Sequence, residues 1–79
     1  MSEKYIPKIY IENMEKGRTY YKEGDLDRAS YHFSISLELE ETPENLFYMG
    51  LISTQKTEHL EALNYFYRSI ELDPDYGNP

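Results

Sequence analysis

Residues 49–74, MGLISTQKTEHLEALNYFYRSIELDP, contain the pattern that decides the fold. Gly50 and Ala62 are small residues twelve positions apart, and small residues let two antiparallel helices cross closely where larger side chains would hold the backbones apart. Phe66 continues the face that Ala62 begins, because residues three or four positions apart share one side of a helix. The proline at the end of the stretch stops the second helix. The pattern therefore predicts a helical hairpin.

The whole chain is short and acidic. It has 79 residues, a net charge of −7 and no cysteine. This length supports one small domain, near the size at which a single core barely offsets the entropy of the chain, so we expect a partner or a second copy to add burial. Without cysteine, disulfides and cysteine-bound metals are excluded.

Charge and hydropathy bear on partners and location. A negatively charged chain is a poor match for nucleic acid or an anionic membrane, because both attract a basic face. Residues 1–39 hold six Lys or Arg against seven Asp or Glu, whereas residues 40–79 hold two against eight. The acidic half is either a solvated face or a surface for a basic partner. No apolar run is long enough to span a membrane, and the opening MSEKYIPK lacks the apolar core of a signal peptide, so we expect a cytoplasmic protein.

Break signals divide the chain into four predicted helices. Gly24 is placed to end the first helix and Asp25 to cap the second. Thr42 can cap the third helix, with Pro43 in its first turn, and Thr57 is an acceptable cap for the fourth. The predicted helices cover residues 7–22, 26–39, 43–55 and 58–72. The inner face of the fourth helix is predicted to hold Leu60, Ala62, Leu63, Phe66, Ser69 and Ile70.

The two halves of the chain repeat each other at an offset of 33 residues, with Gly17 matching Gly50. The tails of the two helix pairs nearly repeat as strings, SLELE at 36–40 and SIELD at 69–73. Such an internal repeat predicts two copies of one helix-turn-helix unit. The other matches are Ala29 with Ala62, Phe33 with Phe66, Ser36 with Ser69, Glu38 with Glu71 and Leu39 with Leu72.

The second copy resembles the tetratricopeptide repeat, a pattern of about 34 residues. The small positions, the aromatic position and the proline of that pattern fall on Gly50, Ala62, Ser69, Phe66 and Pro74. The first copy supplies Gly17, Tyr20, Gly24, Ala29, Phe33 and Ser36. The resemblance covers about residues 10–76 and implies an all-α fold. Two tandem helix-turn-helix units, 10–42 and 43–76, would form a short right-handed α-solenoid of four helices.

Some positions depart from the family pattern. Asn13 and Lys16 stand where bulky apolar residues are usual, and a polar first helix suits an end repeat that faces water. Glu41 replaces the usual proline, and Thr57 replaces the usual glycine between the helices. Repeat arrays normally need about three units. We therefore expect the chain to be a piece of a longer array or a module that assembles.

The family resemblance implies a protein-interaction scaffold, in which the first helices of successive units line a concave groove that takes a peptide or a helix. The groove positions carried over are Ile11, Met14, Arg18, Tyr21 and Lys22 in the first unit, and Glu44, Phe47, Leu51, Thr54 and Gln55 in the second. Met14, Phe47 and Leu51 are expected to floor the groove, or else to be ordinary core packing. Tyr21 is the expected aromatic anchor, and Arg18 and Lys22 are available for an acidic group.

The alternative function is structural self-assembly. An exposed repeat end around Tyr65, Ile70 and Tyr76 is apolar enough to stack on another copy, end to end or by exchange of helices. The expected partners are therefore a protein or peptide, further repeats, or a second copy that makes a homo-oligomer.

Enzymatic readings are weak. His32 and His59 are the only histidines, and we expect both to pack rather than to act as acid or base. Glu58, His59 and Glu61 lie close in sequence, but adjacent residues do not face one another on a helix. We expect no catalytic residue, no metal and no cofactor.

Overall fold

The computed structural model describes residues 6–77, and this part of the chain contains four α-helices and no strand. The predicted all-α class is therefore confirmed, and each helix begins and ends within a residue of its predicted bounds. None of the helices in the described range is both long and apolar enough to cross a membrane. The helices are α1 (Lys8–Glu23), α2 (Leu26–Leu39), α3 (Pro43–Gln55) and α4 (His59–Leu72).

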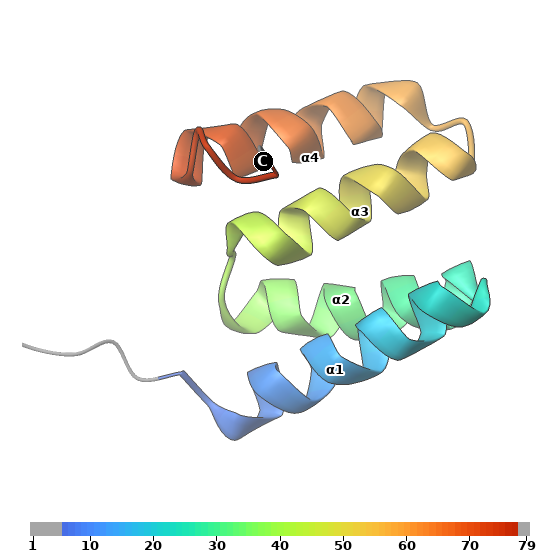
Figure 1. The fold of residues 1–79 in the computed structure, drawn as a ribbon, viewed down its shortest axis with the longest axis vertical. Coiled ribbons are helices and arrows are strands. Elements are labelled where there is room, and N and C mark those ends of the chain that lie inside the picture. Colours follow the sequence, from blue (N-terminus) through green and yellow to red (C-terminus); the bar gives the residue numbers. More distant parts are fainter. Residues whose placement is uncertain (1–5, 78–79) are drawn as a thin grey trace, which may run out of the picture. The chain divides into compact units, whose positions relative to one another are not determined.

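The chain divides into two compact units, Met1–Glu40 and Glu41–Pro79. In the first unit α1 and α2 form a helical hairpin, and in the second α3 and α4 form another (Figure 1). A hairpin of this kind hides one face of each helix against the other, so each unit has a packed centre of its own.

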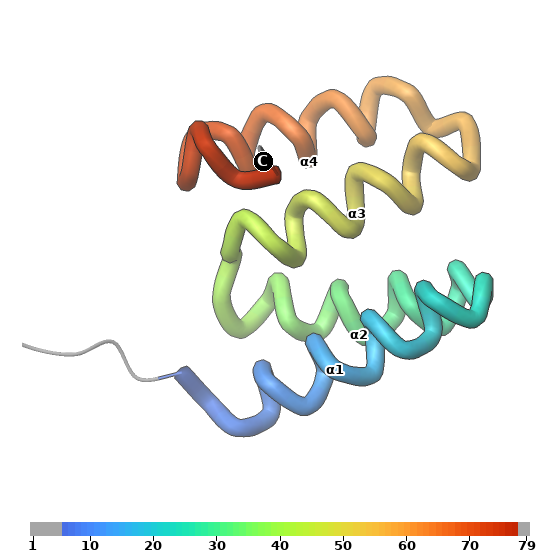
Figure 2. The backbone as a smooth tube through the Cα atoms, viewed as in Figure 1, coloured from blue at the N-terminus to red at the C-terminus, as the bar shows by residue number. Residues whose placement is uncertain are grey.

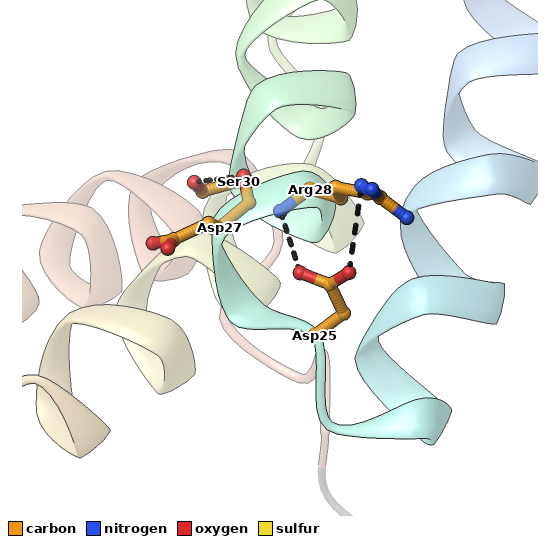
Figure 3. A network of polar contacts seen from close by, with 4 residues as sticks. All are labelled: Asp25, Asp27, Arg28 and Ser30. Atoms are coloured by element: carbon orange, nitrogen blue, oxygen red, sulfur yellow. Dashed lines mark hydrogen bonds and ion pairs between the residues drawn. The ribbon is translucent and has the colours of Figure 1, made fainter.

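The turn of the first unit follows the sequence prediction. Gly24 ends α1 in the left-handed conformation, with φ of 85°, a backbone region that glycine enters at no steric cost. The Asp25 side chain then caps α2 by accepting a hydrogen bond of 3.1 Å from the Arg28 backbone N–H. The Arg28 guanidinium lies 3.6 Å from the same carboxylate, and the Ser30 hydroxyl donates to the Asp27 carbonyl (Figure 3).

The turn of the second unit has the same hydrogen bonds without the glycine. The Thr57 N–H donates to the Thr54 carbonyl at 3.0 Å, as the Gly24 N–H donates to the Tyr21 carbonyl at 3.0 Å. Thr57 therefore sits at a φ of 61°, which is unfavourable for a β-branched residue. The prediction that Thr57 caps α4 is wrong. Its backbone occupies the left-handed turn position, and the N-cap is Glu58, which makes no side-chain capping bond.

The start of α3 is held by a reciprocal pair of bonds. The Thr42 hydroxyl accepts from the Asn45 backbone N–H at 3.2 Å, and the Asn45 side-chain oxygen accepts from the Thr42 N–H at 2.9 Å. The end of α4 is tied to the same place, because the Ser69 hydroxyl donates to the Pro43 carbonyl at 3.0 Å. Two orphan amides at the start of α3 are thereby satisfied, as the sequence predicts for Thr42.

Each hairpin crosses where a glycine meets a phenylalanine ring. A Cβ added to Gly17 would lie 2.8 Å from the Phe33 ring, and one added to Gly50 would lie 2.5 Å from the Phe66 ring. A Cβ atom essentially never lies this close to a ring that it is not bonded to, so only glycine fits both positions without a shift of the ring or the helix. The other residues of the repeat pattern differ in burial. Ala29, Phe33, Ser36, Ala62 and Ser69 are buried, Phe66 is half-buried, and Pro74 is exposed just beyond the end of α4.

The predicted inner face of α4 is too wide. Ala62 and Ser69 are buried, as an inner face requires, but Leu60, Leu63 and Ile70 are exposed. The reason is that α4 has apolar residues around more than half of its circumference, while α3 covers only one side of it. Apolar character alone could not show which of these residues face α3.

Replacing Thr57 with glycine should stabilise the protein. Glycine removes the strain of the left-handed conformation, which raises the free energy of unfolding by about 1–2 kcal/mol. The greater backbone entropy of glycine in the unfolded chain offsets part of this, so we expect a net gain of about 0.5–1 kcal/mol. Urea unfolding measures this gain as a higher midpoint at an unchanged slope. Gly24→Thr is the matched reverse change, because no atom lies within 4 Å of a Cβ at that position, and it should lose stability. A lower midpoint for Thr57→Gly would contradict this account of the turn.

Replacing Gly50 with alanine should destabilise the second hairpin. Alanine is the better helix former by about 1 kcal/mol, but its Cβ would collide with Phe66, and overpacking of this kind costs about 1–3 kcal/mol. The double variant Gly50→Ala with Phe66→Leu should recover part of the loss, because leucine leaves room for the new methyl group. Thermal unfolding followed by circular dichroism gives both values. A Gly50→Ala protein as stable as the parent would show that the close crossing is not required.

Candidate functional site

The predicted groove residues form one stripe on α1 and an equivalent stripe on α3. Met14, Arg18 and Tyr21 are four and three positions apart, a spacing that places them on one side of α1. At the repeat offset of 33 they correspond to Phe47, Leu51 and Thr54 on α3. Each unit therefore offers one stripe of similar position and different chemistry.

The α1 stripe changes character along the helix. Ile11 at its start is exposed, and Met14 in the middle is buried, with 3% of its surface accessible. Arg18 and Tyr21 are half-buried, and Lys22 at the end is exposed. The C-terminal half of the α1 stripe thus carries two cations, Arg18 and, in the last turn, Lys22, with Tyr21 on the same helix. This combination suits a carboxylate and an apolar group on one ligand.

The α3 stripe is more apolar. Phe47 and Leu51 are half-buried, so each keeps some surface for a ligand, and Glu44 at the start of the stripe is also half-buried. Thr54 and Gln55 at its end are exposed, and the Thr54 hydroxyl donates to the Gly50 carbonyl at 2.9 Å. This stripe suits apolar side chains of a ligand, with polar groups at one end.

Phe47 belongs to an aromatic cluster that the sequence reasoning missed. Its ring centre lies 5.6 Å from that of Phe66 and 5.6 Å from that of Tyr76. Tyr76 reaches this place because the chain turns back after α4 (Figure 2), in a turn where the Tyr76 N–H donates to the Asp73 carbonyl at 3.1 Å. The prediction placed Tyr76 at an exposed repeat end. The residue is 36% exposed, and its ring also contacts that of Phe47 on α3. The turn-forming string DPDYG was the available signal.

The other two residues predicted for self-association lie on α4. Tyr65 is half-buried, and the Arg68 guanidinium lies 5.8 Å from the centre of its ring. Arg68 also pairs with Glu41, which fixes the guanidinium near the start of α3. Ile70 is exposed. The three predicted residues therefore have three different surroundings and do not form one patch.

A polar cluster around His32 joins α1 to α2. The His32 Nδ1–H donates to the Asn13 side-chain oxygen at 2.8 Å, and the Asn13 amide donates to the Ile9 carbonyl at 2.9 Å. The imidazole stacks on Tyr20, with ring centres 5.5 Å apart. Burial, and secondarily the charge of Lys16, lower the pKa of His32 below its usual value. The ring is oriented by a neutral amide, so this cluster resembles packing more than an acid or base site.

The outer side of α1 differs from the corresponding side of α3. A shallow pocket on α1 is lined by polar and aromatic residues, among them Lys16, Thr19 and Tyr20. At the repeat offset these three align with Met49, Ile52 and Ser53, which are all buried. The first unit therefore has a water-facing surface where the second has a packed one. Within residues 6–77 no group of three or more His, Asp or Glu is placed to hold a metal ion.

Comparison with known proteins finds similarity to an assembly protein. The chain is 35% identical over 57 residues to the photosystem I assembly protein Ycf3 of Acaryochloris marina (strain MBIC 11017). The aligned part covers 67% of this chain and 34% of the relative, so the chain spans about a third of the length of the protein it matches. No protein-family model matches the chain, and no solved structure matches it.

The His32 cluster predicts a pH dependence of stability. Because the folded pKa lies below the unfolded value near 6.5, the unfolded chain binds the proton more readily. The contribution of neutral His32 is therefore complete above about pH 6.5 and is lost as the pH falls through the folded pKa. Urea unfolding at neutral and mildly acidic pH should show a smaller fall in stability for His32→Gln than for the parent. Equal falls in stability for His32→Gln and the parent would contradict a role of His32 in this pH dependence. In a separate test, nuclear magnetic resonance titration of Lys16→Gln should show a raised His32 pKa, because the repelling charge of Lys16 is removed.

Proposed function

We propose that this chain is a tetratricopeptide-repeat module that binds another protein through the α1 and α3 stripes. The observation that carries the proposal is the recurrence of one stripe, at the same position of the first helix, in both units. Met14 and Phe47 correspond at the repeat offset, as do Arg18 and Leu51. Met14 is buried, so the accessible part of the α1 stripe is Arg18 and Tyr21. On α3, Phe47 and Leu51 keep accessible surface, which a repeat that only packed its own core would not need. The proposed role is binding, with no chemical step.

The chemistry of the stripes indicates the kind of ligand. The α3 stripe offers partly exposed apolar surface at Phe47 and Leu51, and the C-terminal half of α1 carries Arg18 and Lys22. Apolar side chains of a peptide or helix complement the α3 stripe, and an acidic group complements the cations of α1. Arg18 and Lys22 lie in the half of the chain that holds six of its eight Lys and Arg residues, so an acidic ligand meets less repulsion there than on the acidic second half.

The similarity to a photosystem I assembly protein supports a role in bringing proteins together. Assembly requires contact with a protein partner, which agrees with a binding module. The aligned part covers a third of that relative, so the proposal takes from it only the general role of protein contact.

A titration with a defined peptide tests the binding surface. The probe is an acetylated, labelled peptide of alternating Leu, Phe and Glu residues, followed by amide chemical shifts of the protein. Shifts should concentrate on α1 and α3. Lys22→Glu should weaken binding by on the order of 10-fold, because it converts an attraction of the ligand carboxylate into a repulsion.

Lys16→Glu is the matched control, since it makes the same change of charge on the same helix outside the stripe. It should leave the affinity within about 2-fold, because screening at physiological salt limits longer-range effects. Shifts that concentrate on α2 and α4, or equal losses for the two variants, would refute the proposed binding surface.

A further inference from the structure

One side of α4 carries large apolar residues that stand in water. Their spacing is three, four and three positions, which aligns them along one side of the helix. The α4 stripe consists of Leu60, Leu63, Tyr67 and Ile70, which are 81%, 52%, 64% and 52% exposed. This is the spacing by which two helices pack side by side, with alternate steps of three and four. The opposite part of α4 already packs on α3 through Ala62 and Ser69.

The repeat offers an internal comparison for this stripe. At the offset of 33, Leu60, Leu63 and Tyr67 correspond to Asp27, Ser30 and Ser34 on α2. The same side of α2 is therefore polar at three of the four positions. The exception is Leu37, which aligns with Ile70. The apolar stripe is consequently a property of α4 alone and not of the repeat.

We propose that α4 is a homodimer interface, in which the α4 stripe of one copy packs antiparallel on the α4 stripe of a second copy. The stripe is symmetric about residue 65, so antiparallel packing places Leu60 opposite Ile70 of the partner and Leu63 opposite Tyr67 of the partner. Each of the four residues meets an apolar residue. Since each chain has one such stripe, the contact is self-complementary and closes at two copies.

The charges at the two ends of α4 select the antiparallel orientation. Lys56, Glu58 and His59 stand at its start, an end of mixed charge, and Glu71 and Asp73 stand at its end. Antiparallel packing brings the acidic end of one helix to the mixed end of the other, where Lys56 lies, whereas parallel packing would set Glu71 and Asp73 against their own copies. Glu61 does not oppose this, because a rotation of about 100° per residue places it on the far side of α4 from the stripe.

Contiguous exposed apolar surface of this kind marks an interaction site. This interface uses α4, whereas the proposed ligand surface uses α1 and α3. The two proposals therefore stand or fall separately.

Sedimentation equilibrium from low to high micromolar concentration tests the dimer. The parent should change from monomer to dimer with no larger species. Leu63→Asp should weaken dimerisation by on the order of 100-fold, because both copies lose a buried leucine and gain a buried charge. Circular dichroism should show unchanged helix content, since Leu63 makes no part of the buried centre.

Ser30→Asp is the matched control, because it adds the same charge at the aligned position of α2. It should leave the dimer unchanged. A parent that stays monomeric at the highest concentration overturns the proposal. A dimer that withstands Leu63→Asp overturns it as well.

The absence of native cysteine allows a direct test of orientation. Asn64 borders the stripe one residue from the predicted two-fold axis, so Asn64→Cys should form a disulfide between copies under mild oxidation. Glu71→Cys borders the same stripe far from the axis, and its two thiols would lie at opposite ends of the interface. Little cross-linking is expected for it. Failure of Asn64→Cys to cross-link, or faster cross-linking of Glu71→Cys, overturns the antiparallel arrangement.

Discussion

The close approach of a glycine to a phenylalanine ring is the constraint on which both hairpins depend. Gly50 faces Phe66, and Gly17 faces Phe33. The glycine determines which side of the first helix faces the second. This sets the rotation of the first helix about its own axis, and therefore the direction in which each of its other residues points. Phe47 lies three positions before Gly50 in the sequence, and Leu51 lies one position after it. The half-exposed position of the proposed ligand stripe is therefore a geometric result of the crossing.

Local signals predicted the helices and most of their ends correctly. Gly24, Asp25 and Thr42 act through neighbours only a few positions away, so their roles could be read from the sequence. Contacts between residues far apart in the sequence were not predicted. Tyr76 takes its place from Phe47, and the pairing of His32 with Asn13 joins two helices across 19 positions of the sequence. Residue type and spacing hold no information on such partners.

The candidate surfaces show the same division. The resemblance to the tetratricopeptide repeat supplied the residues proposed for the α1 and α3 stripes, and their spacing of three and four places them on one side of each helix. Periodicity could not say which apolar residues of α4 are covered, since coverage depends on the width of the neighbouring helix. Leu60 and Leu63 were expected inside and are exposed. The internal repeat was the sounder guide, because the polar residues aligned with them on α2 mark that side as a water-facing one.

The contact between Tyr76 and Phe47 has a consequence for selectivity. In the proposed complex a ligand does not meet an open phenylalanine ring, because Phe66 and Tyr76 already adjoin it. A large aromatic side chain would have to push the tail aside and lose that ring contact, whereas a short aliphatic one could settle next to the tyrosine. The folded-back tail would thus select ligand side chains by size, and the surface at Phe47 would bind leucine or valine in preference to tryptophan.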